Sequence, residues 1–242
     1  DDVRVRTAFT QAIDRQSLID NVTKGGQLPA TSFAPPGIFG APEPGTVGLP
    51  SDPAAAQASL QEYLDENGMT IEDFNGMGIT LMHNTSEGHA NIAAAIQQMW
   101  KDTLGVDVKV ENQEWKVYLE TIQNTTPLAE MPHIWRLGWG ADYADENNWV
   151  HEVFNPDAGA NSIMISPEMD QVGDAVVEFT EATYAAQSAS PEEQLDLYKR
   201  AEQLLVDEIV GIAPIYFYTY QGVEKPWLER LYSDAKYYYL WN

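Results

Sequence analysis

The stretch GITLMHNTSEGHANIAAAIQQMWKDTLGVDVKV, residues 78–110, decides the fold. A short apolar run over residues 78–82 predicts a strand, residues 90–104 have the spacing of a helix that stops at Gly105, and residues 106–110 alternate as a second strand. Two strands joined through a helix are expected to be parallel neighbours, because the crossover returns the chain in the same direction. The stretch therefore predicts the α/β class.

The residues before this unit predict two helices separated by a long loop. Apolar residues at three-four spacing predict one helix over residues 3–22. Six prolines among residues 28–50 fix φ angles and remove backbone donors, so this segment is expected to be irregular. The aspartate–proline pair at residues 52–53 predicts a capped helix over residues 54–67.

The residues after the unit continue the alternation of helices and strands. Ser190 begins a capping box with proline at the first helical position, which is a strong signal for a helix start. The expected elements are helices over residues 115–123, from near 147, from 166–168 and from 190 to about 210, and strands over residues 134–139, 212–218 and 237–241.

The composition excludes several classes of function. The 242 residues carry 37 acidic and 13 basic side chains, a net charge of −24, which opposes binding to nucleic acid or to an anionic membrane surface. The acidity fits either a solvated surface or a cationic ligand. The sequence has no cysteine, which excludes disulfides and thiolate sites, and no run of about 18 apolar residues that would insert into a membrane.

No catalytic or cofactor motif is present in the sequence. The histidines lack the spacing of a zinc site, no Gly-x-Ser-x-Gly elbow occurs, and residues 76–78 lack the third glycine of a dinucleotide fingerprint. We therefore expect no metal and no cofactor. The scattered histidines are His83, His89, His133 and His151.

One dense polar segment, WGADYADENNW at residues 139–149, is the candidate site. Its carboxylates are Asp142, Asp145 and Glu146. Three interpretations remain open from the residues alone: a solvated loop that caps the following helix, a ligand-binding site, and the paired acids of a glycoside hydrolase beside an aromatic platform. The acidic spacing and central glycine of a calcium loop are missing.

Four segments in order give the sequence a resemblance to a known family. They are VRTAFTQAIDR at residues 5–15, AAIQQMW with LGVDV within residues 94–108, RLGWGADY at residues 136–143, and YKRAEQLL with IAPIY within residues 198–216. Together these segments resemble the family 5 extracellular solute-binding proteins, which include the peptide, dipeptide and nickel binding proteins of ABC importers.

The resemblance implies a periplasmic-binding-protein-like (class II) lobe, an α/β fold with a mixed sheet and flanking helices. Residues 1–242 would form a single C-terminal ligand-binding lobe of a two-lobed protein, with the N-terminal lobe absent. The implied protein is a monomer and not an enzyme. It would capture peptides outside the cytoplasm, in the periplasm or as a cell-surface lipoprotein, and deliver them to an ABC importer permease.

The resemblance also assigns roles in the candidate site. Asp142 would pair with the α-ammonium of a peptide, and Trp139 and Arg136 would line the same cleft, with Gly140, Tyr143 and Asp145 completing the site. From its chemistry, Arg136 is equally suited to take a carboxylate in a bidentate fork or to form an ion pair with a neighbouring acid.

The sequence departs from the family pattern at one point. Where the family usually has an acid followed by proline, this chain has Asp145-Glu146. The loop that discriminates ligands thus differs, and an oligosaccharide or another solute remains an alternative, favoured by the tryptophans and by Asn147-Asn148. Trp149 is expected in the core, because it would fall on the following helix.

Overall fold

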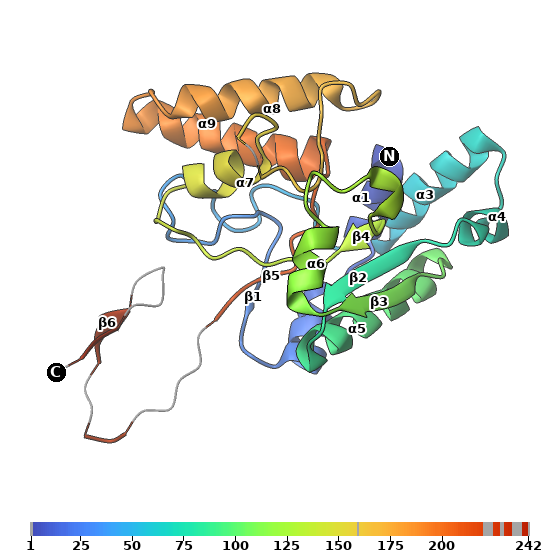
Figure 1. The fold of residues 1–242 in the computed structure, drawn as a ribbon, viewed down its shortest axis with the longest axis horizontal. Helices are drawn as coiled ribbons and strands as arrows, with labels where there is room; N and C mark the ends of the chain where they lie inside the picture. Colours follow the sequence, from blue (N-terminus) through green and yellow to red (C-terminus); the bar gives the residue numbers. More distant parts are fainter. Residues whose placement is uncertain (1, 159, 220–224, 228–229, 234–238, 242) are drawn as a thin grey trace.

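The structure is a computed structural model that describes residues 2–158, 160–219, 225–227, 230–233 and 239–241 (Figure 1). Its helices are α1 (Val3–Gln11), α2 (Arg15–Leu18), α3 (Pro53–Asn67), α4 (Ile71–Gly76), α5 (Glu87–Leu104), α6 (Trp115–Thr121), α7 (Glu152–Phe154), α8 (Gly173–Ala186) and α9 (Pro191–Gln203). Shorter π-helical turns are Ile19–Thr23, Asn147–His151 and Leu204–Glu208, and a 3₁₀ turn is Leu128–Glu130.

The strands are β1 (Leu28–Pro29), β2 (Thr80–Asn84), β3 (Lys109–Gln113), β4 (Ile134–Trp135), β5 (Tyr216–Phe217), β6 (Arg230–Ser233) and β7 (Tyr239–Trp241). A three-stranded sheet has the order β3-β2-β4, and β2 is parallel to both neighbours. The crossover predicted from residues 78–110 is therefore confirmed. The antiparallel pairings, β1 with β5 and β6 with β7, form separate small sheets.

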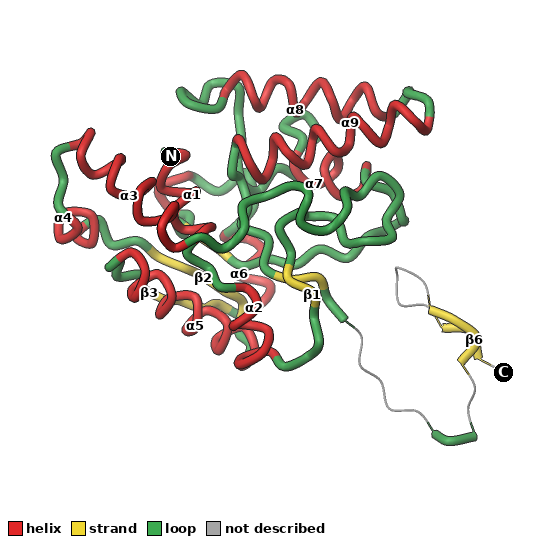
Figure 2. The backbone as a smooth tube through the Cα atoms, turned by 180° about the vertical axis from the view of Figure 1, so that it is seen from behind, coloured by secondary structure: helices red, strands yellow, loops and turns green. Residues whose placement is uncertain are grey.

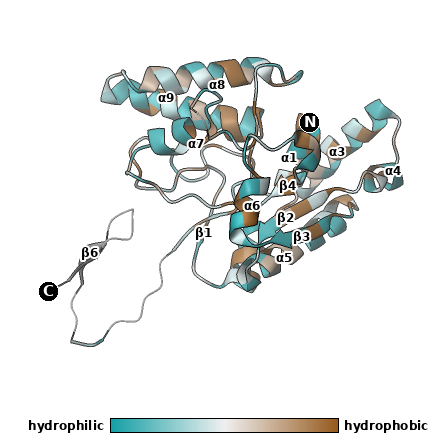
Figure 3. Ribbon diagram, viewed as in Figure 1, coloured by the Kyte–Doolittle hydropathy of each residue, from teal (hydrophilic) through white to brown (hydrophobic). Residues whose placement is uncertain are grey.

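Two hydrophobic clusters organise the chain. The first lies between the parallel sheet, α5 and the helices α1 and α3, and the second is built on α8 and α9. Figures 1 and 2 show α8 and α9 side by side at one end and the parallel sheet with α5 at the other. Hydrophobic and hydrophilic residues are interleaved along the helices, as expected when one face of each helix is buried (Figure 3). No helix in the described part of the chain has both the length and the apolar character needed to cross a bilayer.

The capped helices follow the prediction closely. Asp52 accepts hydrogen bonds from the backbone N–H groups of Ala54 and Ala55 at the start of α3, and Gly68 ends that helix with a φ of 61°. At α9, Ser190 and Glu193 form the predicted capping box. These signals work because they act within three or four residues.

The prediction of one helix over residues 3–22 is wrong. The chain forms α1, leaves helical geometry, and starts again as α2 followed by a π-helical turn. Asp14 has extended backbone angles, and its side chain accepts a hydrogen bond from the N–H of Ser17, so it caps a second helix inside the apolar pattern. The pattern itself does not reveal the break, because the buried apolar residues of both helices pack in the same hydrophobic cluster.

The predicted helix start at residues 166–168 is also wrong, because α8 begins only at Gly173. The Ser166 hydroxyl instead donates to the carboxylate of Glu168 in a local turn. A Cβ at Gly173 would lie 2.2 Å from the carbonyl oxygen of Pro167, so the chain folds back tightly on itself before the helix can start.

Several boundaries differ by a few residues. β2 and β3 begin two and three residues later than predicted, because Val106 and Val108 pack in the core ahead of the ladder. The strands predicted over residues 134–139 and 212–218 shorten to β4 and β5. The sequence did not predict α4, which has its own capping box of Thr70 and Asp73. Of the strand predicted over 237–241, residues 237 and 238 lie outside the described residues.

We predict that Trp100→Phe destabilises the fold by about 1–3 kcal/mol. The Trp100 indole N–H donates to the buried carbonyl of Phe9 at 2.8 Å, and phenylalanine would leave that carbonyl unpaired. Urea unfolding followed by circular dichroism measures the change. The matched control is Trp227→Phe, since Trp227 is 78% exposed and its replacement is expected to stay within about 0.5 kcal/mol. Equal stabilities of the two variants would contradict the prediction.

Candidate functional site

The candidate site begins where parallel strands end at one edge of the sheet. β4 pairs with β2, and the N–H of Arg136, directly after β4, donates to the carbonyl of Met82 in β2 at 2.9 Å. The carboxyl ends of neighbouring parallel strands form the usual ligand edge of an open α/β sheet. Arg136 therefore starts the loop at this edge.

A buried tyrosine fixes the backbone of Arg136. Tyr118 of α6 is fully buried, and its hydroxyl donates to the Arg136 carbonyl. Burial raises the pKa of Tyr118 above its usual value, so the hydroxyl keeps its proton and remains a donor. The position of the Arg136 backbone is thus set by both the sheet and the helix that covers it.

The Arg136 side chain is held by a neutral group. Its guanidinium donates to the hydroxyl of Tyr218, and within residues 2–158 and 160–219 it forms no ion pair with a carboxylate. The alternative of an ion pair with a neighbouring acid is therefore not observed in the described part of the chain. An oriented guanidinium without a bound carboxylate is suited to take an anionic group of a ligand.

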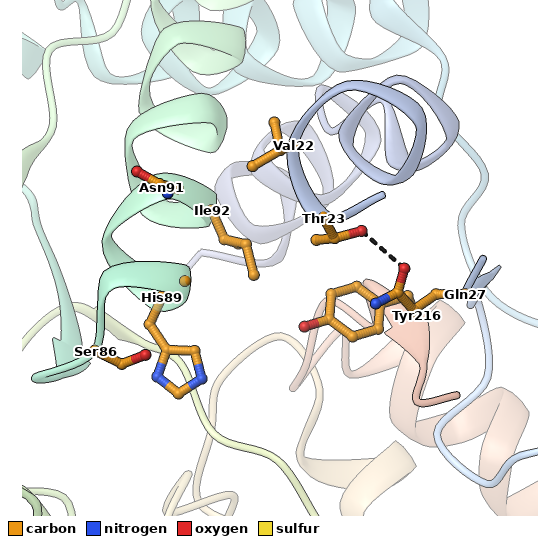
Figure 4. A pocket seen from close by; sticks show the side chains of 9 residues that line it. Val22, Thr23, Gln27, Ser86, His89, Asn91, Ile92 and Tyr216 are labelled. Carbon is orange, nitrogen blue, oxygen red and sulfur yellow. Dashed lines mark hydrogen bonds between the residues drawn. The ribbon is translucent and has the colours of Figure 1, made fainter. Parts of the chain in front are cut away.

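A recess of about 260 Å³ is lined in part by His89 and Tyr216 (Figure 4). It lies between the π-helical turn after α2, the start of α5 and β5. The positive charge of Arg136 acts on this recess. Burial is the largest cause that lowers the pKa of His89, and the charge of Arg136 is the second. The lining residues are Val22, Thr23, Gln27, Ser86, Gly88, His89, Asn91, Ile92 and Tyr216.

The loop that follows is organised by one buried amide, Asn148. Its Oδ1 accepts hydrogen bonds from the N–H of Asp142 at 2.8 Å and from the indole N–H of Trp139 at 3.3 Å. Its Nδ2 donates to the carboxylate of Glu152. Asn148 is completely buried, so its side chain is committed to the loop and is not available to a sugar or any other ligand.

Tyr143 is tied to the same network from outside. Its hydroxyl donates to Glu152 Oε1 at 2.5 Å and accepts from Asn147 Nδ2 at 2.7 Å. Partial burial, followed by the hydrogen bond to the Glu152 carboxylate, raises the pKa of Tyr143 to about 12. The residue remains 40% exposed.

Asp142 and Gly140 lie on the exposed side of the loop. Only the backbone N–H of Asp142 is engaged, and no donor in residues 2–158 and 160–219 hydrogen-bonds to its carboxylate. A Cβ at Gly140 would meet no atom within 4 Å. The loop therefore presents a carboxylate toward open space rather than into the interior.

Asp145 and Trp149 are turned inward. The Asp145 carboxylate accepts from the N–H of Asn147 at 2.9 Å. Burial is the largest cause that raises the pKa of Tyr198, and the charge of Asp145 is the second. The predicted contact of Asp145 with a ligand is not tested by this arrangement and stays a prediction. Trp149 is 7% exposed and contacts the Phe33 ring, so its predicted place in the core is confirmed.

The sequence does not predict part of this edge. It gives His89 no role beyond the absence of zinc spacing, and it predicts Tyr216 and Tyr218 only as parts of a strand. Their proximity to Arg136 joins segments about 50 and 80 residues apart, which no local pattern records. The described residues contain no group of three or more acidic or histidine side chains placed to hold a metal ion.

Residues 1–161 match the family described as bacterial extracellular solute-binding proteins, family 5 Middle. The chain is 35% identical over 222 residues to the oligopeptide-binding protein OppA of Bacillus subtilis, covering 90% of this chain and 38% of that protein. It is 34% identical over 234 residues to the periplasmic murein peptide-binding protein MppA of Escherichia coli, covering 94% of this chain and 39% of the relative. The chain thus spans about two fifths of the length of these relatives.

Solved structures agree with the sequence relatives. The unliganded open form of the periplasmic murein tripeptide binding protein MppA superposes with a TM-score of 0.73 at 29% identity, covering 94% of this chain and 41% of that one. The Haemophilus influenzae OppA complex with the peptide RPPGFSPFR also gives a TM-score of 0.73, at 26% identity, covering 95% and 42%. The expected periplasmic-binding-protein-like α/β fold is confirmed.

We predict that Asn148→Leu destabilises the chain by about 1–3 kcal/mol, because it leaves the N–H of Asp142 and the indole N–H of Trp139 without their acceptor. Chemical unfolding monitored by tryptophan fluorescence measures the loss. Asn147→Leu is the control, since Asn147 is only half-buried and its side chain donates to the exposed Tyr143 hydroxyl; less than about 1 kcal/mol is expected. An Asn148→Leu variant as stable as this control would disprove the organising role.

Proposed function

This chain belongs to family 5 of the bacterial extracellular solute-binding proteins, and we propose that it is one lobe of the peptide-capturing component of an ABC importer. The observation that supports this most directly is a pair of opposite charges on one loop. Arg136 is oriented by Tyr218 and has no ion pair with a carboxylate in the described part of the chain, and Asp142 is exposed. A short peptide has complementary charges at its two ends.

Asp142 is proposed to bind the α-ammonium group of the peptide. Its backbone is fixed by buried Asn148, so the backbone of the loop does not need to be ordered when the ligand arrives. A charge-assisted hydrogen bond of this kind contributes about 1.5–3 kcal/mol when water is excluded. Trp139, Gly140 and Tyr143 would lie along the same loop against the ligand, and Asp145 would act beside them.

Arg136 is proposed to bind a carboxylate of the peptide. The planar guanidinium offers parallel donors that match two carboxylate oxygens. The recess lined by His89 and Tyr216 would accommodate a side chain or the end of the peptide. Because both hydrogen-bonding partners of such a fork are charged, removing the arginine is expected to weaken binding of free peptides in particular.

The transport cycle follows from the family and from the length of the relatives. The relatives named above are more than twice as long as this chain, and we propose that the remaining length supplies a second lobe that closes on the peptide. Closure would exclude water, and the closed form would dock on a permease. The protein would act as a monomer outside the cytoplasm, as a periplasmic protein or a cell-surface lipoprotein, and would perform no chemistry on its ligand.

The other interpretations receive less support. The asparagine argument for an oligosaccharide weakens because Asn148 is buried within the loop. The glycoside hydrolase interpretation finds no support in the relatives and solved structures described above. Peptide binding is therefore the proposed function.

We expect Asp142→Asn in the full-length protein to weaken binding of free di- to pentapeptides about ten- to hundredfold, the factor that corresponds to a charge-assisted bond. Isothermal titration calorimetry measures the affinities. N-acetylated peptides should bind the wild type and the variant equally, because they carry no ammonium group. Asp170→Asn removes the same charge from an exposed position outside the loop and should have no effect. Unchanged affinity of Asp142→Asn for free peptides would remove Asp142 from the site.

We expect Arg136→Met to weaken binding of peptides with a free carboxyl terminus at least about tenfold, with little further loss for C-terminally amidated peptides. The same calorimetric titrations, arranged as a double-mutant cycle, isolate the pairing between Arg136 and the carboxylate. Lys116→Met, at the exposed surface of α6, is the matched control for loss of a cation. Equal losses for free and amidated peptides would show that Arg136 does not recognise that group.

A further inference from the structure

A buried carboxyl interacts with the candidate loop, which is the segment of residues 139–149. Glu202 of α9 is 0% exposed, and it accepts hydrogen bonds from the backbone of the proline-rich segment 28–50. The N–H of Phe33 lies 3.1 Å from Oε1 and 3.0 Å from Oε2, and the N–H of Ala34 lies 2.8 Å from Oε1. Two backbone donors to one carboxyl favour its ionised form, so Glu202 carries the negative charge of the pair more readily than a carboxyl without such donors.

A second buried carboxyl, Glu146, lies at the end of the candidate loop. It is also 0% exposed, yet no N–H or O–H group in the described residues donates to either of its carboxyl oxygens. Its backbone N–H donates to the carbonyl of Phe39 at 2.8 Å. Gly40 makes room for it, because a Cβ there would lie 2.8 Å from the Cβ of Glu146. An ionised carboxylate without any partner would be very unfavourable in this position.

The two carboxyls are close enough to affect each other's ionisation. Burial is the largest cause that raises the pKa of each, and the charge of Glu202 is the next cause for Glu146. The other ionisable groups that face the pair are Asp145 on the loop, Tyr198 on α9, and Asp207 in the π-helical turn after α9. None of these is a cation, and no lysine or arginine in the described part of the chain contributes to either shift.

A proton fits this site better than a metal ion. The oxygens of Glu202 are already occupied by backbone donors, and the described residues bring no third acidic or histidine side chain into a metal-binding group. One shared proton suffices to remove the repulsion between two carboxylates. The hydrogen-bond pattern places this proton on Glu146, since Glu202 is the carboxyl that receives donors.

We propose that Glu146 and Glu202 are a positioning pair that shares one proton and holds the candidate loop against the segment 28–50, so that ligand affinity falls when the pair loses that proton. The proposal rests on the proposed function, in that it assumes the loop binds the ligand. Glu146 connects the candidate loop to the segment 28–50, because its backbone N–H donates to the carbonyl of Phe39. Asp145 forms a β-bridge with the same residue. Neither residue of the pair is expected to touch the ligand.

The direction of the pH dependence follows from the raised pKa values. A carboxyl whose pKa is raised on folding contributes stability that is complete below its unfolded pKa, 4.5 for glutamate, and that is lost as the pH rises through the folded value. Above that value two carboxylates would face each other in a buried site without a cation. The loop would then separate from the segment 28–50, and Asp142 would lose its fixed position.

Glu146→Gln is the decisive variant, because its amide is neutral at every pH and still donates to Glu202. In the full-length protein, the peptide dissociation constant of the wild type relative to this variant is expected to rise at least about tenfold between about pH 5 and pH 9, since each pKa unit by which ligand-bound and free states differ is a factor of ten. The ratio cancels the titration of the peptide itself. Glu181→Gln, an exposed replacement on α8, should keep the wild-type pH profile.

Two ligand-free measurements keep the test of the pair separate from the test of the function. Difference infrared spectra should show the carbonyl stretch of a protonated carboxylic acid in the wild type and in Glu181→Gln but not in Glu146→Gln. Amide exchange at Phe33 and Ala34, corrected for its intrinsic pH dependence, should lose protection with rising pH only when Glu146 is present.

The possible results distinguish a failure of the proton-sharing pair from a failure of the proposed function. Absence of the infrared band, the same exchange profile in Glu146→Gln as in the wild type, or stabilisation of the loop by added sodium or calcium ions would overturn the proposal. Intact infrared and exchange signatures in a protein that binds no peptide at any pH would overturn the proposed function and, with it, the link to affinity.

Discussion

The candidate loop depends on one constraint: its polar backbone groups must find partners although it contains no strand and little regular helix. Buried polar side chains supply those partners. Asn148 accepts from the backbone of Asp142, and Glu202 accepts from the backbone of the segment that packs beneath. Because unpaired buried N–H groups are strongly unfavourable, these side chains determine where the loop can lie. The positions of the exposed charges in the candidate site therefore depend on buried residues that the ligand would not contact.

The acidic side chains of the chain have different effects depending on whether they are exposed or buried. Most of the 37 acidic side chains can lie in water, where repulsion is screened and each costs little. The few buried carboxyls are different, since each must be hydrogen-bonded, paired or protonated. Glu202 accepts from backbone N–H groups, whereas no N–H group in the described residues donates to Glu146. The net charge of −24 therefore indicates little about the ligand, whereas the state of two carboxyls bears directly on the loop.

The sequence predicted those parts of the fold that local chemistry determines. The caps of α3 and α9 and the parallel crossover of β2 and β3 all lie within short stretches, and all are confirmed. The break before α2 and the late start of α8 were missed, because each depends on a cap or a tight backbone approach that apolar periodicity does not record. The site followed the same rule. Trp149 was placed correctly in the core from its local pattern, whereas the role of Glu202 could not be found, since its bonds reach Phe33, 169 residues away.

The departure from the family pattern at residues 145–146 is a local change in the sequence that also creates a contact with a distant residue. A proline after the acid would limit the backbone by its ring and would bring no charge. Glutamate at the same place keeps its N–H, which bonds to Phe39, and carries a carboxyl into the interior beside Glu202. The backbone of the loop is thus held by hydrogen bonds of Glu146 in place of the ring of a proline. A covalent restriction is the same at every pH, but a hydrogen bond between two acids exists only while one of them holds a proton. A loop fixed in this way can bind tightly under one condition and loosely under another without any change in the residues that face the ligand.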